Sequence, residues 1–382
     1  MVKKILLILA GIIVGFILVV GLKFNQFYQK IYIPTSVKPK DKTSYNILFL
    51  GYGGAGHDGP YLTDTMLITH VDIKQNKALL VSVPRDIWVK LPTKSGQDFH
   101  AKINTLYEMG LFPSDFPDVD QSQFTNPAKT GLVSSTLQKI TGLPIDYFVG
   151  IDFTGFVKAV DILGGVDINV DRSFKDDQYP LDGHEKDLCG KDDDFKQIEL
   201  YLNDPNANAE EKAKLFQQKP DLETFLKNAT DSPQLAFPCR FETIKFDAGP
   251  EHMDGKTALK YVRSRHSSED GGDFGRARRQ QLFLEAVKAK VLNIGFIPRI
   301  IPLLDQLKDH IATDIPLDAT QRFASEIKDL SKYKVGHLVL SDEKYIEQTR
   351  SPEGQDVLIP KAGIDKWDQV KAWIRNTING KK

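Results

Sequence analysis

The residues with the clearest chemical potential lie between Tyr261 and Gln281, a segment that contains five arginines and two glutamines. Guanidinium groups bind phosphate oxygens two at a time, so this cluster is typical of a site for a compact phosphate or pyrophosphate. The alternative is an exposed helix face whose arginines pair with surface carboxylates. Nucleic-acid binding is disfavoured, because 50 basic against 51 acidic residues and a pI near 6.7 leave no broad positive surface.

Helical periodicity predicts which of these side chains face the protein interior. For a helix that starts near Phe274, Arg276 and Gln280 fall on one stripe with the apolar residues Phe283, Val287, Val291 and Ile294. Asp273 takes the capping position at the start of that helix. An unpaired buried guanidinium is too costly, so we expect Arg276 and Gln280 to line a polar pocket. Arg278, about 200° round the helix from Arg276, should be solvated.

A second group of polar residues stands where strands near the N-terminus begin or end. Residues 45–51 are typical of a buried strand, a glycine-rich loop follows, and further strands are predicted at 66–71 and 78–83. Asp64 and Arg85 therefore lie at strand boundaries, from which both can point into one crevice. The glycine loop has neither Walker A nor dinucleotide-binding spacing, so it indicates close backbone approach or a plain connection.

Six motifs in order resemble the LytR-CpsA-Psr family over about residues 43–292. They are LTDTM, VPRD, KIN, DYFVGIDFTGFVKAVDILGGVDINV, HMDGKTALKYVRSR and DFGRARRQQ. Members of that family are membrane-anchored enzymes that transfer a glycopolymer from a polyprenyl-pyrophosphate carrier to peptidoglycan. The resemblance implies this phosphotransferase activity, which forms a phosphodiester link outside the cytoplasmic membrane. It also implies an α/β fold of α-β-α layers with a central mixed sheet.

The resemblance assigns roles to residues in both clusters. The residues implied in catalysis and pyrophosphate binding are Arg85, Arg263, Arg265, Asp273 and Arg276. Those implied in substrate binding are Lys102, Gln280 and Arg279. Asp64 and Asp273 are implied as ligands of Mg²⁺, or of Mn²⁺, directly or through water. Either aspartate is a candidate base for the attacking hydroxyl, although a metal-bound carboxylate is a poor one.

This sequence departs from the family pattern in two places. The GxDxR segment that commonly follows the first strand is GYGGAGHDGP here, and Leu62-Thr63 stands where an arginine commonly precedes the SDTM-type motif. Asp58 with His57 is one candidate replacement for the missing carboxylate, and a simple turn is the other. Two further functions therefore stay open: a polyprenyl-pyrophosphate hydrolase, and a non-enzymatic lipid-binding envelope regulator.

Residues 1–24 predict a cytoplasmic tip and a transmembrane signal anchor. The run Ile5–Leu22 contains no charge over 18 residues and follows Lys3 and Lys4. This length suffices to span a bilayer, at the short end of the usual range, and no clean cleavage site follows. The paired lysines favour a cytoplasmic N-terminus, which places the catalytic domain outside the cell membrane, in contact with membrane lipid.

The rest of the chain divides into a linker at 25–42, a catalytic domain at 43–295 and an extension at 296–382 that packs on the same domain. Alternating strand and helix patterns predict a mixed sheet with helices on both faces. An insertion at about 172–245 is acidic, since residues 176–231 contain 15 acidic and 7 basic residues, a net charge of −8. Its KDDD run is typical of a solvated surface rather than a calcium site, and the insertion is a candidate selector of polymer or acceptor.

The two cysteines, Cys189 and Cys239, both lie in or beside this insertion. Outside the cytoplasm such a pair is readily oxidised, so we expect a disulfide that closes a loop of about 50 residues. The alternatives are a catalytic thiol, which needs a histidine partner, and a zinc site with His184, for which no recognisable spacing is present.

Overall fold

The computed structural model describes residues 22–34, 42–122, 130–204, 207–291, 305–326, 330–340 and 344–380. Within these ranges, no helix combines the length and the apolar character needed to cross a membrane. The predicted anchor at residues 5–22 lies, apart from its last residue, outside the described residues. A helix at 22–31 precedes the main body, and Ile33 N donates a hydrogen bond to Thr313 O at 2.8 Å.

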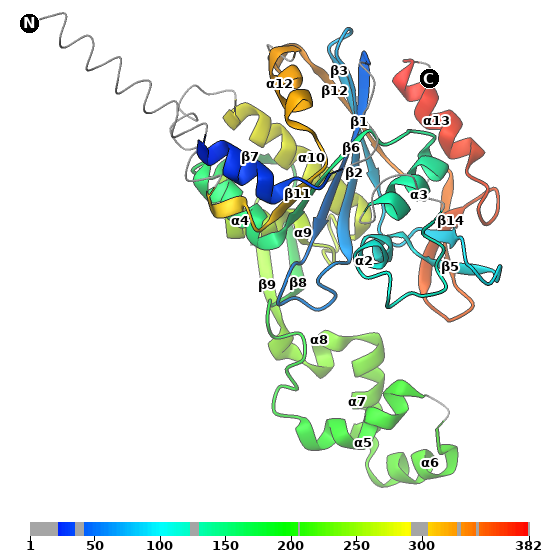
Figure 1. The fold of residues 1–382 in the computed structure, drawn as a ribbon. Coiled ribbons are helices and arrows are strands. Elements are labelled where there is room, and N and C mark those ends of the chain that lie inside the picture. Colours follow the sequence, from blue (N-terminus) through cyan, green and yellow to red (C-terminus); the bar gives the residue numbers. More distant parts are fainter. Residues whose placement is uncertain are drawn as a thin grey trace, which may run out of the picture.

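A six-stranded mixed sheet forms the centre of the molecule, in the order β11-β6-β1-β2-β3-β12 (Figure 1). Its strands are β1 Ser44–Tyr52, β2 Thr63–Asp72, β3 Lys77–Val83, β6 Tyr147–Asp152, β11 Ile311–Thr313 and β12 Lys334–Val339. The first three form an antiparallel meander, whereas β6 and β12 run parallel to β1 and β3. The predicted mixed sheet is therefore present.

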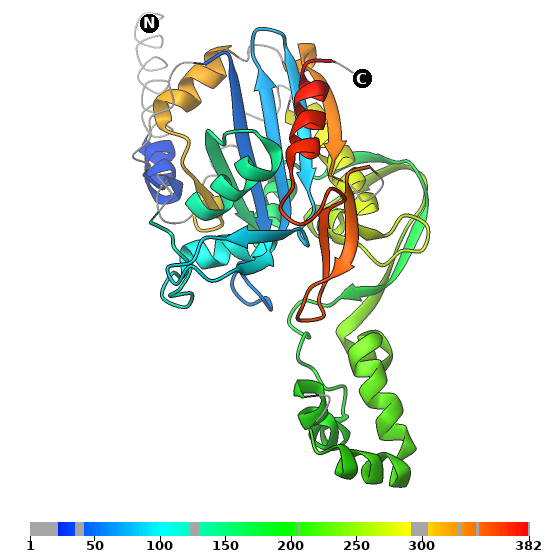
Figure 2. The ribbon, with the colours of Figure 1, turned by 90° about the vertical axis from the view of Figure 1, so that its right-hand side faces the viewer.

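Helices cover both faces of this sheet (Figure 1). On one face, which is turned to the viewer in Figure 2, lie α2 (Leu106–Leu111), α3 (Gly131–Thr141) and α13 (Asp368–Ile378), which share a core with the sheet. Trp367, Val370 and Ile374 are buried there, as their helical spacing predicts. The other face carries α4 (Phe153–Ile162), α9 (Gly255–Arg263), α10 (Gly272–Val291) and α12 (Leu317–Glu326).

In the described part of the chain, four two-stranded ribbons surround the central sheet. They are β4 (Trp88–Leu91) with β5 (Phe99–Lys102), β7 (Val166–Val170) with β10 (Gly249–Met253), β8 (Phe174–Pro180) with β9 (Phe241–Phe246), and β13 (Ile346–Arg350) with β14 (Asp356–Pro360). The sequence pattern around residues 102–109 predicts a helix; the structure begins this helix, α2, at Leu106, because Lys102 is the last residue of β5.

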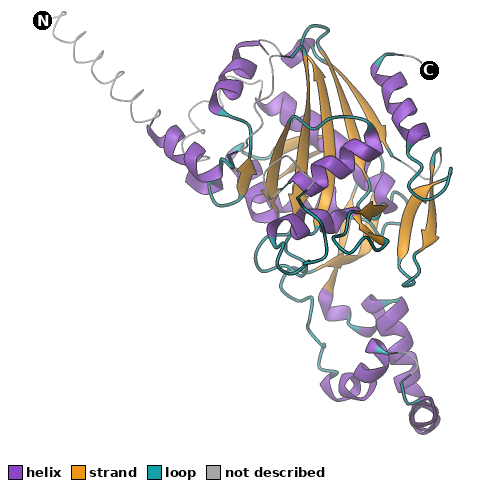
Figure 3. Ribbon diagram, turned by 45° about the vertical axis from the view of Figure 1, so that its right-hand side comes forward, coloured by secondary structure: helices purple, strands orange, loops and turns teal. Residues whose placement is uncertain are grey.

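The acidic insertion folds into a helical unit that extends from the ends of β8 and β9 (Figure 3). Its helices are α5 (Asp192–Asn203), α6 (Ala209–Gln218), α7 (Pro220–Asp231) and α8 (Pro233–Ala236). They enclose a small core of their own around Ile198, Phe225 and Phe237. The KDDD run places three aspartates in the first turn of α5, where the positive end of the helix dipole stabilises them.

Cys189 and Cys239 form a disulfide at the base of this unit, with their Cα atoms 5.6 Å apart and the two residues 50 positions apart in sequence. In the loop-entropy model, closing such a loop contributes about 4 kcal/mol. We expect the variant C189S/C239S to lose most of the stability of this unit, because its core is too small to compensate. Limited proteolysis should cleave within residues 181–240 much faster than in the parent protein while the central sheet stays intact. Equal cleavage rates would show that the helices hold together without the bond.

Candidate active site

A polar pocket of about 180 Å³ opens at the edge of the sheet where β1 and β3 end and β2 begins. Because β2 and β3 are antiparallel, the start of β2 and the end of β3 lie at this same edge. Six of the residues named from sequence line the pocket: Asp64, Arg85, Arg263, Arg265, Arg276 and Gln280. The two clusters predicted separately, one from each half of the chain, thus meet in one cavity.

Asp86 connects the cations on one side of the pocket. Its carboxylate lies 2.8 Å from Lys102 Nζ, 3.5 Å from Arg265 NH2 and 3.6 Å from Arg85 Nε. Burial alone would raise the pKa of Asp86, but the hydrogen bond from Lys102 and the nearby positive charges hold it below its ordinary value. Arg85 also forms an ion pair with Asp64. Lys102 is therefore linked to the pocket through Asp86 and does not itself line it.

Helix α10 presents Arg276 and Gln280 inward, as its periodicity predicts. Arg276 is 6% exposed, and Gln280 Nε2 donates to Thr65 Oγ1 at 2.9 Å, which ties the helix to β2. The helix begins at Gly272, two residues before the predicted start. Asp273 stands in its first turn, and its side chain lies outside the described part of the structure, as do the side chain of Val291 and residue Ile294.

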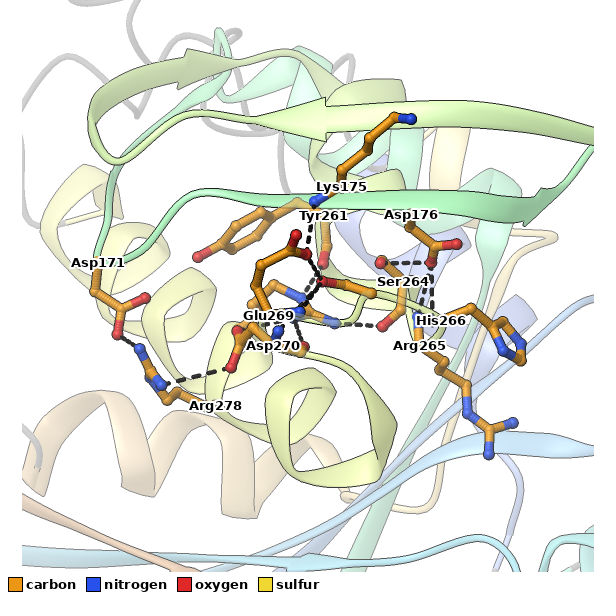
Figure 4. A network of polar contacts seen from close by, with 12 residues as sticks. Asp171, Lys175, Asp176, Tyr261, Ser264, Arg265, His266, Glu269, Asp270 and Arg278 are labelled. Carbon is orange, nitrogen blue, oxygen red and sulfur yellow. Dashed lines mark hydrogen bonds and ion pairs between the residues drawn. The ribbon is translucent and has the colours of Figure 1, made fainter.

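The other two arginines of α10 serve the fold. Arg279, predicted to bind substrate, is 1% exposed and donates to Tyr261 O at 2.9 Å and to Asp270 O at 2.6 Å. Arg278, predicted to be solvated, is half-buried and forms an ion pair with Asp171 (Figure 4). Both predictions therefore need correction. Helix α10 packs against β7 and α9. Arg278 faces Asp171, just beyond the end of β7, instead of solvent, and Arg279 faces the end of α9 instead of the substrate.

Asp176, which belongs by composition to the acidic insertion, holds the turn that carries Arg265. Its carboxylate accepts hydrogen bonds from Ser264 Oγ at 2.7 Å and from the amides of Arg265 and His266, both at 3.1 Å. In Figure 4 the side chains of Arg265 and His266 extend away from Asp176 on the same side. The missed signal is strand alternation: Asp176 lies two residues after Phe174, on the buried face of β8.

We expect the stability of the protein to fall at acid pH partly through Asp176. Burial opposes the charged form, yet the hydrogen bonds from Ser264 and the backbone amides lower the pKa of Asp176 below its ordinary value. A lowered pKa in the folded state contributes stability above the unfolded pKa of about 4, and protonation removes that stability as the pH falls further. Urea unfolding between pH 7 and pH 3 should show this loss. In Asp176→Asn the free energy of unfolding should be lower at pH 7 and should change less steeply with pH.

Arg263 approaches the pocket from the end of α9 and is held by aromatic rings and a carboxylate. Its guanidinium lies 4.0 Å from the ring centroid of Phe153 and donates to Asp182 Oδ1 at 3.1 Å and to Tyr179 OH at 3.2 Å. Asp182 also lies 3.5 Å from His57 Nδ1, in the glycine loop. Asp58, the candidate replacement for the family's first carboxylate, is exposed and does not line the pocket.

Comparison with known proteins connects this arrangement to one family. The model of the LytR_cpsA_psr family matches residues 22–362. TagU of Enterococcus faecalis, named a polyisoprenyl-teichoic acid–peptidoglycan teichoic acid transferase, is 22% identical over 342 residues, which are 85% of this chain and 84% of that protein. Regulatory protein MsrR of Staphylococcus aureus is 26% identical over 279 residues, which are 72% of this chain and 58% of that protein.

Among solved structures, TagV of B. subtilis superimposes with a TM-score of 0.53 and 19% identity, over 89% of this chain and 99% of that chain. At this identity the likeness bears on the fold alone. The family model, by contrast, matches most of the sequence, including all the residues that line the pocket, from Asp64 to Gln280. The chain belongs to the LytR-CpsA-Psr family.

Proposed function

We propose that this chain transfers a glycopolymer from a polyprenyl-pyrophosphate carrier to a hydroxyl group of peptidoglycan. One observation carries the proposal: four guanidinium groups, those of Arg85, Arg263, Arg265 and Arg276, line one pocket together with the carboxylate of Asp64. A pyrophosphate diester is the compact anion that such a set binds best. The name of the TagU relative, a teichoic acid transferase, supports the same reaction.

The arginines can supply most of the catalysis by positioning and by charge. The acceptor hydroxyl oxygen attacks the phosphorus that carries the glycopolymer, and the bond from that phosphorus to the bridging oxygen breaks. Polyprenyl phosphate leaves, and the hydroxyl proton passes to Asp64 or Asp273. Negative charge grows on the departing phosphate, where the guanidinium groups stabilise it in a pocket that is already formed.

Mg²⁺ fits the donor set of this pocket. Magnesium is usually held by one or two carboxylates together with substrate phosphate oxygens and water, and Asp64 provides a carboxylate at the pocket wall. Asp176 is less suited, because both of its oxygens accept hydrogen bonds within the fold, Oδ2 from Ser264, Arg265 and His266 and Oδ1 from the amide of Gln178. Asp64, by contrast, pairs with Arg85, which itself lines the pocket. When bound, the ion would neutralise part of the pyrophosphate charge; Mn²⁺ would serve in the same way.

The proposed substrate requires a location at the outer face of the cytoplasmic membrane. We propose that the charge-free run at residues 5–22 anchors the chain as a single span with a cytoplasmic N-terminus, so that the pocket meets membrane lipid and the wall. Residues 43–295 would form most of the catalytic domain, and the extension at 296–382 would complete it, because β11 and β12 belong to the central sheet. The helical insertion leaves this domain at β8, whose residues Asp176 and Tyr179 line the pocket, and this position suits a role in polymer or acceptor choice.

The proposal is tested by replacing Arg85 with lysine in the full-length protein. Lysine keeps the charge but loses the two-pronged guanidinium geometry, so transfer should fall by roughly 5- to 150-fold, equivalent to about 1–3 kcal/mol. The assay follows a labelled glycopolymer from its polyprenyl-pyrophosphate carrier onto purified peptidoglycan. Arg278→Lys is the matched control on the far side of α10, where lysine can still pair with Asp171. Equal losses in both variants would place the reaction elsewhere.

Two alternative functions give different results in the same assay. A hydrolase would release the polymer into solution whether or not peptidoglycan is present. A non-enzymatic regulator would bind the carrier without metal-dependent turnover. Two observations are the reason to test this alternative: the MsrR relative is named a regulatory protein, and the first-strand carboxylate of the family is absent here. Product on peptidoglycan in the parent protein decides for the transferase.

A further inference from the structure

Three side chains with metal-binding groups converge next to the arginine pocket but outside its lining. His57 comes from the glycine loop between β1 and β2, whereas Asp182 and Glu185 come from the segment that leads from β8 into the insertion. One ligand atom of each lies within 4.8 Å of the other two. Two segments far apart in sequence thus bring an imidazole and two carboxylates together.

The glycine loop fixes the position of the imidazole. A Cβ atom at Gly53 would lie 2.9 Å from His57 Cβ, so only glycine lets the loop fold back this closely. The loop is closed by a hydrogen bond from Gly54 N to Pro60 O at 2.8 Å. The His57 ring packs edge-on against Phe153, with centroids 5.3 Å apart and an interplanar angle of 84°. With 17% of its side chain exposed, His57 is held in place and still reaches solvent.

The donor set indicates the class of ion. His57 Nδ1 and Asp182 Oδ1 are 3.5 Å apart, close enough for one ion to contact both. Mg²⁺ takes oxygen ligands almost exclusively. Zn²⁺ binds imidazole nitrogen together with carboxylate oxygen, so this donor set suits zinc better than magnesium.

We propose that His57, Asp182 and Glu185 form a zinc site, distinct from the magnesium site proposed at Asp64. The two carboxylates balance the charge of the ion, which matters because Arg263 lies 3.1 Å from Asp182. A bound ion would connect the glycine loop to the base of the insertion, beside one of the arginines that line the pocket. The proposal does not depend on the reaction catalysed in that pocket.

Zinc binding is measured on the oxidised full-length protein, without reductant. Reduction would free Cys189 and Cys239, whose sulfur atoms lie near Asp187 and could bind zinc themselves. Co²⁺ titration should give the visible absorption of a tetrahedral ion at one equivalent, and Zn²⁺ should displace it. Isothermal titration with Zn²⁺ should show that His57→Gln and Asp182→Asn each weaken binding at least tenfold.

The matched control is His252→Gln, which removes another histidine paired with a carboxylate, Asp167, at 2.6 Å. This variant should bind zinc as the parent does. Circular dichroism must show that each variant is folded. The proposal is overturned if the parent protein binds no zinc at micromolar concentration, or if the His57 and His252 variants bind zinc with equal affinity. It is also overturned if Asp64→Asn abolishes zinc binding while His57→Gln and Asp182→Asn do not weaken it.

Discussion

Arg265→Ala is expected to reduce glycopolymer transfer by more than tenfold while leaving the Tm nearly unchanged. The Arg265 side chain is 25% exposed and its guanidinium lies 3.5 Å from Asp86, a separation at which a partly exposed ion pair contributes little stability. The hydrogen bond that anchors this position comes from its backbone amide to Asp176, and alanine retains that amide. The lost guanidinium should therefore affect phosphate binding and charge stabilisation, and not packing.

Transfer assays and thermal unfolding on the same preparations separate these two effects. Arg263→Ala should also lose more than tenfold in transfer, but with some loss of stability, because Arg263 stacks on Phe153 and pairs with Asp182. If Arg265→Ala lowers the Tm as much as Arg263→Ala does, the residue supports the fold. Unchanged transfer in Arg265→Ala would remove this arginine from the site.

The sequence predicted the parts of the site that depend on local periodicity. The helical period of residues 274–294 predicted that Arg276 and Gln280 face inward, and the predicted strand boundaries put Asp64 and Arg85 at one edge of the sheet. All four residues line the pocket. Both inferences use spacings of a few residues, within which backbone geometry fixes the direction of a side chain. The mixed sheet followed from the same alternation of strand and helix patterns.

Long-range pairing explains what the sequence could not predict. Asp176 on β8 accepts a hydrogen bond from Ser264, which follows α9 and lies 88 positions later in the sequence. The charges that surround Asp176 in sequence made it part of an acidic run, although its side chain is 1% exposed. The three aspartates at the start of α5, by contrast, are exposed, as their composition predicted. Composition describes a segment, whereas partners decide which of its charges are buried.

Arg279→Ala is expected to destabilise the protein by about 3–5 kcal/mol, the usual cost of removing one partner from a buried ion pair. Arg279 NH1 lies 2.9 Å from Asp270 Oδ2, and both side chains are buried. The same guanidinium stacks over Phe174 at 4.5 Å and donates to the carbonyls of Tyr261 and Ser264, on either side of Arg263. Alanine would remove the nearer cationic partner of the buried Asp270 carboxylate, which would keep the 3.5 Å contact with Arg278. It would also remove a donor to both carbonyls of the turn that carries Arg263 and Arg265.

Urea unfolding at neutral pH measures this loss, and Arg279→Lys provides the comparison. Lysine keeps the charge beside Asp270 but cannot reach the acceptors on both sides of the turn, so it should recover only part of the stability. Transfer by folded Arg279→Lys at low temperature should fall less than transfer by Arg265→Ala, because Arg279 touches the turn and not the pocket. If Arg279→Lys were instead fully stable and as inactive as Arg265→Ala, Arg279 would bind substrate after all, and the buried network around Asp270 would have to open for it to do so.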